Sequence, residues 1–141
     1  MNLVFKILKL IKIFSTAKFS IKKTKKKKFL IYDISGSSEI LKYLPKNDTF
    51  VLSVRGEVIN LRIFLLSILK FKFKWKFSQY LVFFIEKVNP NIIITFIDNN
   101  PEFYKLKKFF QDKKTIFIQN GIRGYDNDVF GLLEKNLIDT N

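Results

Sequence analysis

The chain has 141 residues, enough for one domain with a sizeable core, and 48% of them are hydrophobic, which argues against a disordered chain. It contains no Cys and no His, which excludes disulfides, thiolate- or histidine-ligated zinc, and Ser-His-Asp catalysis. Any acid–base chemistry therefore falls to Asp, Glu, Lys or Tyr, and the sequence offers no candidate metal site.

The formal net charge of +14 is concentrated at the amino end. Residues 1–28 contain ten lysines and no acidic residue, which leaves only +4 for the rest of the chain. A basic, apolar segment ahead of a nearly ordinary domain favours an anionic membrane surface as a partner over nucleic acid.

Residues 1–20 are predicted to form a basic amphipathic helix. Leu3, Ile7, Leu10 and Phe14 recur at helical spacing, with lysines on another side. The segment is too short and too charged to span a bilayer, and it lacks the features of a secretory signal. We expect it to lie in the membrane interface; the alternative is a helix packed on the domain.

A lysine-rich linker, residues 22–28, follows this helix. Near an anionic leaflet each lysine contributes about 1 kcal/mol to binding. The residues expected to contact the membrane are Lys6, Lys9, Lys12, Lys22, Lys23, Lys25, Lys26, Lys27 and Lys28. The alternative is a solvated linker with no partner.

Residues 29–34 and 49–54 are predicted to be the first two strands of the domain, separated by a turn containing Gly36 and a short helix over residues 39–43. No glycine-rich nucleotide-binding motif is present. The second strand ends at Arg55-Gly56-Glu57, which places one cation and one carboxylate where a ligand can reach them. A mutual surface ion pair is the equally weighted alternative.

Residues 60–70 and 78–88 are predicted to be amphipathic helices that cover the sheet. Between them, residues 70–77 alternate lysines with aromatic side chains, including Trp75. We rank packing of these aromatics on the body first, membrane contact second and base stacking third.

Two further buried strands are predicted at residues 92–97 and 115–118, joined by a helix over residues 102–110. Polar residues follow each strand: Asp98, Asn99 and Asn100 after the first, and Gln119, Asn120, Gly121 and Arg123 after the second. A final helix is expected over residues 126–134. In parallel sheets ligands bind beyond the carboxyl ends of the strands, so we expect these clusters to share one rim.

The expected fold is therefore α/β: a Rossmann-like open parallel sheet of about four strands in the order 2-1-3-4, with flanking helices. Residues 1–28 would form the basic helix and linker, residues 29–135 the domain, and residues 136–141 a frayed tail.

Two motifs carry a resemblance to a known family. Residues 94–106, ITFIDNNPEFYKL, and residues 116–124, IFIQNGIRG, resemble a family of bacterial surface-carbohydrate biosynthesis proteins, which are glycosyltransferase-like enzymes of lipopolysaccharide or capsule assembly. The likeness extends more weakly back through Asp33 and Arg55-Gly56-Glu57 to the basic amino end. It implies that the chain corresponds to the amino-terminal, acceptor-side half of a GT-B enzyme, without the half that binds the sugar nucleotide.

The residue chemistry suits that implication. Asp98 or Glu57 is a candidate base for an acceptor hydroxyl, and Arg55 or Arg123 can stabilise developing negative charge. Gly56, Asn99, Asn100, Gln119, Asn120 and Gly121 complete the candidate ligand-binding set. No cofactor is expected in this chain, and a sugar nucleotide only if a second domain is supplied.

The expected partners are an anionic membrane surface, a saccharide or lipid-linked acceptor, and a separate donor-binding domain or subunit. The expected location is the cytoplasmic side of the inner membrane. The alternatives are a non-catalytic membrane-associated scaffold module and, less favoured, a nucleic-acid-binding protein.

Overall fold

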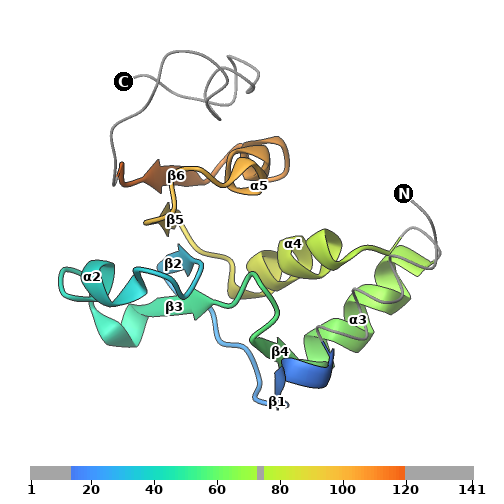
Figure 1. Cartoon of the computed structure of the whole chain (residues 1–141). Coiled ribbons are helices and arrows are strands. Elements are labelled where there is room, and N and C mark those ends of the chain that lie inside the picture. The colour runs from blue at the N-terminus through green and yellow to red at the C-terminus, as the bar shows by residue number, and fades with distance from the viewer. Residues whose placement is uncertain (1–13, 73–74, 120–141) are drawn as a thin grey trace.

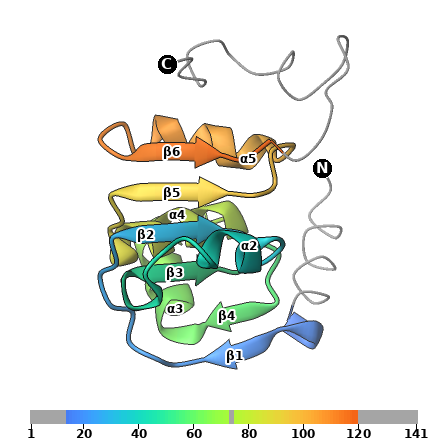
Figure 2. The same ribbon diagram turned by 90° about the vertical axis from the view of Figure 1, so that its left-hand side faces the viewer.

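The computed structural model describes residues 14–72 and 75–119 (Figure 1). Its centre is a parallel sheet of β2 (Phe29–Tyr32), β3 (Thr49–Leu52), β5 (Ile92–Thr95) and β6 (Lys114–Phe117), in the order β3-β2-β5-β6 (Figure 2). The α/β prediction is confirmed, and the observed order corresponds to 2-1-3-4 of the four expected strands. Ile93 and Ile94 of β5 are buried and Ile92 is half-buried, as expected for a strand that lies between two others and is covered on both faces.

Helices cover both faces of this sheet (Figures 1 and 2). Helix α2 (Ser37–Leu41) lies on one face; α3 (Leu61–Phe71), α4 (Phe77–Val88) and α5 (Pro101–Tyr104) lie on the other. Asn60 and Asn100 begin α3 and α5 by accepting a backbone hydrogen bond in the first turn. The predicted helix over residues 102–110 is shorter, because α5 passes into the 3₁₀ helix η3 (Lys105–Lys108); another 3₁₀ turn, η1 (Lys46–Asp48), precedes β3.

Successive side chains of β2 point to opposite faces of the sheet, so the core has two parts. Leu30 and Tyr32 pack with the aromatic side chains of α4 and α5, whereas Ile31 packs with Ile40 of α2 and Ile94 of β5. The larger cluster contains most of the buried phenylalanines and tyrosines, so the face under α3, α4 and α5 provides most of the apolar burial.

A second, two-stranded sheet was not predicted. Strand β1 (Lys18–Ser20) pairs in parallel with β4 (Val58–Asn60), and both run opposite to the four central strands (Figure 2). The prediction of a helix through residue 20 is therefore wrong for Lys18–Ser20, although residues 14–16 are helical. The apolar pattern of the amino end is compatible with a helix or a strand. Residues 18–20 form a strand because they pair with the edge of β4.

The segment predicted as a linker is hydrogen-bonded to the domain. The backbone oxygen of Lys22 accepts a hydrogen bond from the Asn60 amide, and the backbone N–H of Lys27 donates to the oxygen of Val88 at 3.1 Å. The described lysines of this segment are still mostly exposed, so their cationic groups remain available to an anionic partner.

Several predictions lie outside the described residues. These are the contacts of Lys6, Lys9 and Lys12, the positions of Asn120, Gly121 and Arg123, the helix over residues 126–134 and the tail over residues 136–141.

Candidate functional site

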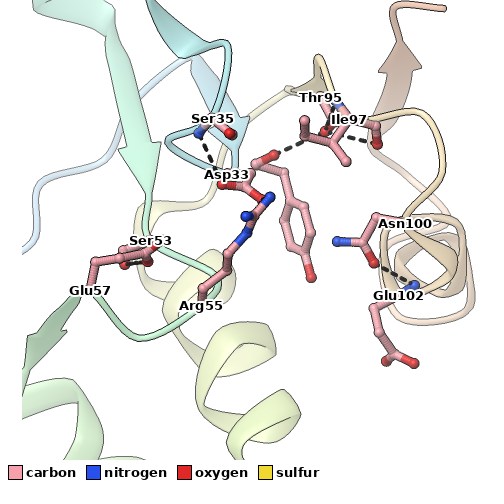
Figure 3. A network of polar contacts seen from close by, with 10 residues as sticks. Asp33, Ser35, Ser53, Arg55, Glu57, Thr95, Ile97, Asn100 and Glu102 are labelled. Atoms are coloured by element: carbon pink, nitrogen blue, oxygen red, sulfur yellow. Dashed lines mark hydrogen bonds and ion pairs between the residues drawn. The ribbon is translucent and has the colours of Figure 1, made fainter. Parts of the chain in front are cut away.

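The carboxyl ends of β2, β3 and β5 meet at one edge of the sheet, where polar side chains gather (Figure 3). Asp33 follows β2 and is only 2% exposed. Arg55 follows β3 and donates through Nε to Asp33 Oδ2 at 3.1 Å, while its Nη2 lies 3.1 Å from the same oxygen. The half-exposed guanidinium therefore compensates a buried carboxylate while keeping one side toward solvent.

The backbone around Asp33 is shaped for this contact. Its φ of 98° is unusual for a residue other than glycine, and its Oδ1 accepts a hydrogen bond from the N–H of Ser35 at 3.0 Å. In the sequence, Asp33 entered only as a weaker part of the family resemblance and not as a candidate site residue. The available signal was an aspartate directly after a buried strand, but its cationic partner 22 residues away could not be identified from spacing.

Arg55 and Glu57 do not pair with each other. Glu57 accepts a hydrogen bond from the Ser53 hydroxyl at 2.5 Å, and Ser53 Oγ in turn accepts from the N–H of Val58 at 3.0 Å. The alternative of a mutual ion pair between Arg55 and Glu57 is therefore wrong. These contacts fix the loop around Gly56, whose φ of 87° favours glycine, and they hold Glu57 at the base of that loop.

The Thr95 hydroxyl fixes the turn that follows β5. The Thr95 hydroxyl donates to the backbone oxygen of Tyr32 at 3.0 Å and accepts from the N–H of Ile97 at 3.0 Å. This joins the ends of β5 and β2, so the polar residues that follow the two strands share an edge.

Asp98, the first candidate base, is 1% exposed. Its backbone oxygen accepts a hydrogen bond from the Tyr104 hydroxyl at 2.6 Å, which ties the turn to α5. A residue this buried cannot take a proton from a bound acceptor without a local rearrangement, so in this conformation Asp98 shapes the turn rather than contacting a ligand.

Asn99, Asn100 and Glu102 form the more accessible part of this turn. Asn99 and Glu102 are exposed. Asn100 is half-buried, and its Oδ1 accepts a hydrogen bond from the N–H of Glu102 at 3.0 Å. Asn100 and Glu102 lie on the same edge as Asp33 and Arg55 (Figure 3). Of the predicted ligand-binding residues, Arg55 and Asn100 thus lie on one edge of the sheet (Figure 3).

Gln119 also reaches this edge. The N–H of Ile118 donates to the Thr95 oxygen at 2.9 Å, which extends the parallel pairing of β5 and β6 to the residue before Gln119. Gln119 is exposed, so it can contribute an amide to the rim.

Tyr32, the last residue of β2, is buried beside Asp33 and was not singled out in the sequence. Burial raises the pKa of its hydroxyl above the ordinary range, and the negative charges of Glu102 and Asp33 raise it further. The hydroxyl therefore stays protonated even in alkaline solution, and the ring packs in the core against Phe103.

A separate groove of about 380 Å³ lies between the lysine-rich segment and the β3–β4 region. Lys22, Lys23, Lys25 and Lys27 line one side, and apolar residues of β3 with Phe84 line the other. Thr24 also lines it, and its buried hydroxyl has no hydrogen-bond partner. Four of the lysines expected at a membrane thus border an apolar depression.

The aromatic side chains between α3 and α4 point into the body where they are described. Trp75 packs edge-to-face on Phe64 and donates from Nε1 to the Ser67 hydroxyl at 2.8 Å. Phe71 and Phe77 also pack against the core. The first-ranked prediction, packing, is confirmed for these three residues, and membrane insertion of Trp75 is excluded in this conformation.

Within residues 14–72 and 75–119, no group of three potential metal-ligating side chains occurs, and no helix is long and apolar enough to cross a bilayer. Comparison of the chain with protein-family models, curated proteins and solved structures gave no match.

Proposed function

We propose that this chain is the acceptor-side domain of a glycosyltransferase-like protein of bacterial surface-polysaccharide synthesis, acting at the cytoplasmic leaflet of the inner membrane. The observation that carries the proposal is the shared rim: Arg55 beside Asp33, with Asn100 and Glu102 across the same sheet edge. Carboxylates, amides and a guanidinium with one free side are the groups that recognise sugar hydroxyls.

The surroundings of the two candidate bases favour a role in binding the acceptor over catalysis by this domain alone. Asp98 is buried, and Glu57 is engaged by Ser53. Catalysis would therefore require a second domain or subunit. That partner would also bind the sugar nucleotide, since this sequence contains no glycine-rich phosphate-binding motif.

The lysines of residues 22–28 support the membrane part of the proposal. They stand on an extended segment fixed to the domain, mostly exposed, so they can meet an anionic headgroup layer without unfolding.

The alternative function, a non-catalytic scaffold on the membrane, is equally supported by the exposed lysines. It gives no role to the polar rim. A nucleic-acid-binding function is disfavoured, because Phe71, Trp75 and Phe77 are packed and cannot stack on bases.

Saturation-transfer NMR on the full chain tests the glycan part, with core oligosaccharide released from lipopolysaccharide and a panel of sugar nucleotides as probes. Saccharide signals are expected, with none from the nucleotides. Glu102→Gln should weaken them severalfold if Glu102 hydrogen-bonds sugar hydroxyls.

Glu39→Gln is the matched control for Glu102→Gln. Both glutamates are about half exposed and pair with a lysine three residues later, at 2.5 Å for Glu102 and 2.6 Å for Glu39. Glu39 belongs to α2, on the other face of the sheet. If no saturation is transferred to the saccharide, or if both variants lose the saccharide signals equally, the rim is not a glycan site.

A further inference from the structure

Helix α3 has an apolar outer face as well as an apolar inner one. Ile63, Phe64 and Ser67 are buried against the domain. On the opposite side, Leu65 is 59%, Leu66 40% and Leu69 69% exposed. A surface helix ordinarily presents polar residues there, so these three side chains, called here the leucine face, need a separate explanation.

The residues around the leucine face are cationic. Arg62 precedes it by one turn on the same side, and Lys70, Lys72 and Lys76 follow it, all exposed. In the described parts of α3, α4 and their connection, Glu86 is the one carboxylate, and it is paired with Lys70 at 2.7 Å. The field around the face is therefore positive and largely uncompensated.

We propose that the leucine face inserts into the interfacial region of an anionic bilayer, with Arg62, Lys72 and Lys76 at the level of the headgroups. Apolar side chains surrounded by lysine and arginine are the pattern of a helix that lies in a membrane interface. The inference rests on the membrane association in the proposed function and deepens it by assigning the contact to a folded element rather than to the amino-terminal segment alone.

Core packing fixes α3 to α4, with the ring centroids of Phe64 and Tyr80 5.9 Å apart. Lys70 also pairs with Glu86, and Trp75 closes the connection between the helices through Ser67. The leucine face is consequently presented by a rigid helix pair, so its insertion needs no rearrangement of the core.

Cosedimentation of the full chain with vesicles tests the proposal. The vesicles are phosphatidylcholine with or without phosphatidylglycerol. Leu65→Ser with Leu69→Ser should lower partitioning into the anionic vesicles at least about tenfold, because two largely exposed leucines lose their transfer into lipid. The matched control is Tyr43→Ser with Phe109→Ser, which removes exposed aromatics, 86% and 63% exposed, from other parts of the surface and should leave partitioning unchanged.

A second measurement is independent of the stability of these variants. The chain has no native cysteine, so Leu69→Cys labelled with an environment-sensitive fluorophore reports on one position. Its emission should shift to the blue on addition of anionic vesicles, whereas the same label on Phe109→Cys should not respond.

Three results would overturn the proposal. If the leucine variant partitions like the unmodified chain while deletion of residues 1–13 abolishes binding, membrane association stands but α3 does not carry it. If the face mediates self-association in solution and the label does not respond to lipid, it is a protein interface. If the unmodified chain does not bind anionic vesicles, the membrane part of the proposed function is also wrong, whatever the glycan assay shows.

Discussion

The guanidinium of Arg55 lies 3.1 Å from the carboxylate of Asp33, so a half-exposed cation compensates a carboxylate that is only 2% exposed. The pair connects the end of β2 to the loop after β3, two adjacent strands that carry the rim. It therefore serves stability and site geometry together.

Arg55→Ala is expected to lower the free energy of unfolding by about 1–3 kcal/mol, because it leaves the buried Asp33 carboxylate without its partner. Urea unfolding followed by circular dichroism measures it. Lys42→Ala, which breaks the exposed pair with Glu39, should change stability by less than about 1 kcal/mol. Equal effects of the two substitutions would mean that Asp33 is compensated by other groups.

Gly36→Ala should destabilise the fold by about 2 kcal/mol or more, for two reasons. Gly36 has a φ of 72°, and an added Cβ would lie 2.7 Å from Cγ and 2.8 Å from Cβ of Phe96. Thermal unfolding measures the loss.

A double-mutant cycle separates the two reasons. In a Phe96→Ala background the clash with the ring should disappear, whereas the close contact with Cβ of residue 96 and the backbone part should remain, so Gly36→Ala should then be less harmful. A strictly additive cycle would show that Phe96 is not the obstacle.

Stability should fall at alkaline pH through Tyr80. Burial raises the pKa of Tyr80 from 10.0 to about 12, although the hydrogen bond that its oxygen accepts from the N–H of Asn60 opposes the shift. The unfolded state loses its proton first, so the stabilisation is complete below pH 10 and declines as the pH rises toward 12, by about 2 kcal/mol.

Urea midpoints at a series of pH values check this, with Tyr80→Phe as the comparison. The variant should show a shallower decline above pH 10. Tyr32, whose pKa burial also raises, should contribute the remaining slope. Identical pH profiles for the two proteins would contradict the assignment to Tyr80.

Ser67→Ala should cost about 1–2 kcal/mol of unfolding free energy. Ser67 is fully buried, and its hydroxyl accepts from the Trp75 indole while donating to the backbone oxygen of Phe64 at 2.7 Å. Trp75 is the only tryptophan, so its emission reports the loss directly. Ser78→Ala, at an exposed position of α4, is the control and should leave the emission spectrum unchanged.

The sequence by itself determined the central sheet. Runs such as residues 92–95 are too apolar and β-branched to remain outside a core, and Asn60 and Asn100 cap their helices through local hydrogen bonds. Because parallel strands end at a common edge, the positions of Arg55, Asn100 and Gln119 on that edge followed from the strand assignment.

Only the tertiary structure decided which of those side chains are accessible and what each contacts. The burial of Asp98, the pairing of Arg55 with Asp33 rather than Glu57, and the ring contact of Tyr32 with Phe103 depend on chain segments brought together across the sheet. Strand β1 shows the same physical reason: Lys18–Ser20 is extended because β4, some forty residues away, offers an open row of backbone hydrogen bonds. Local pattern specifies elements, whereas partners distant in sequence specify their contacts.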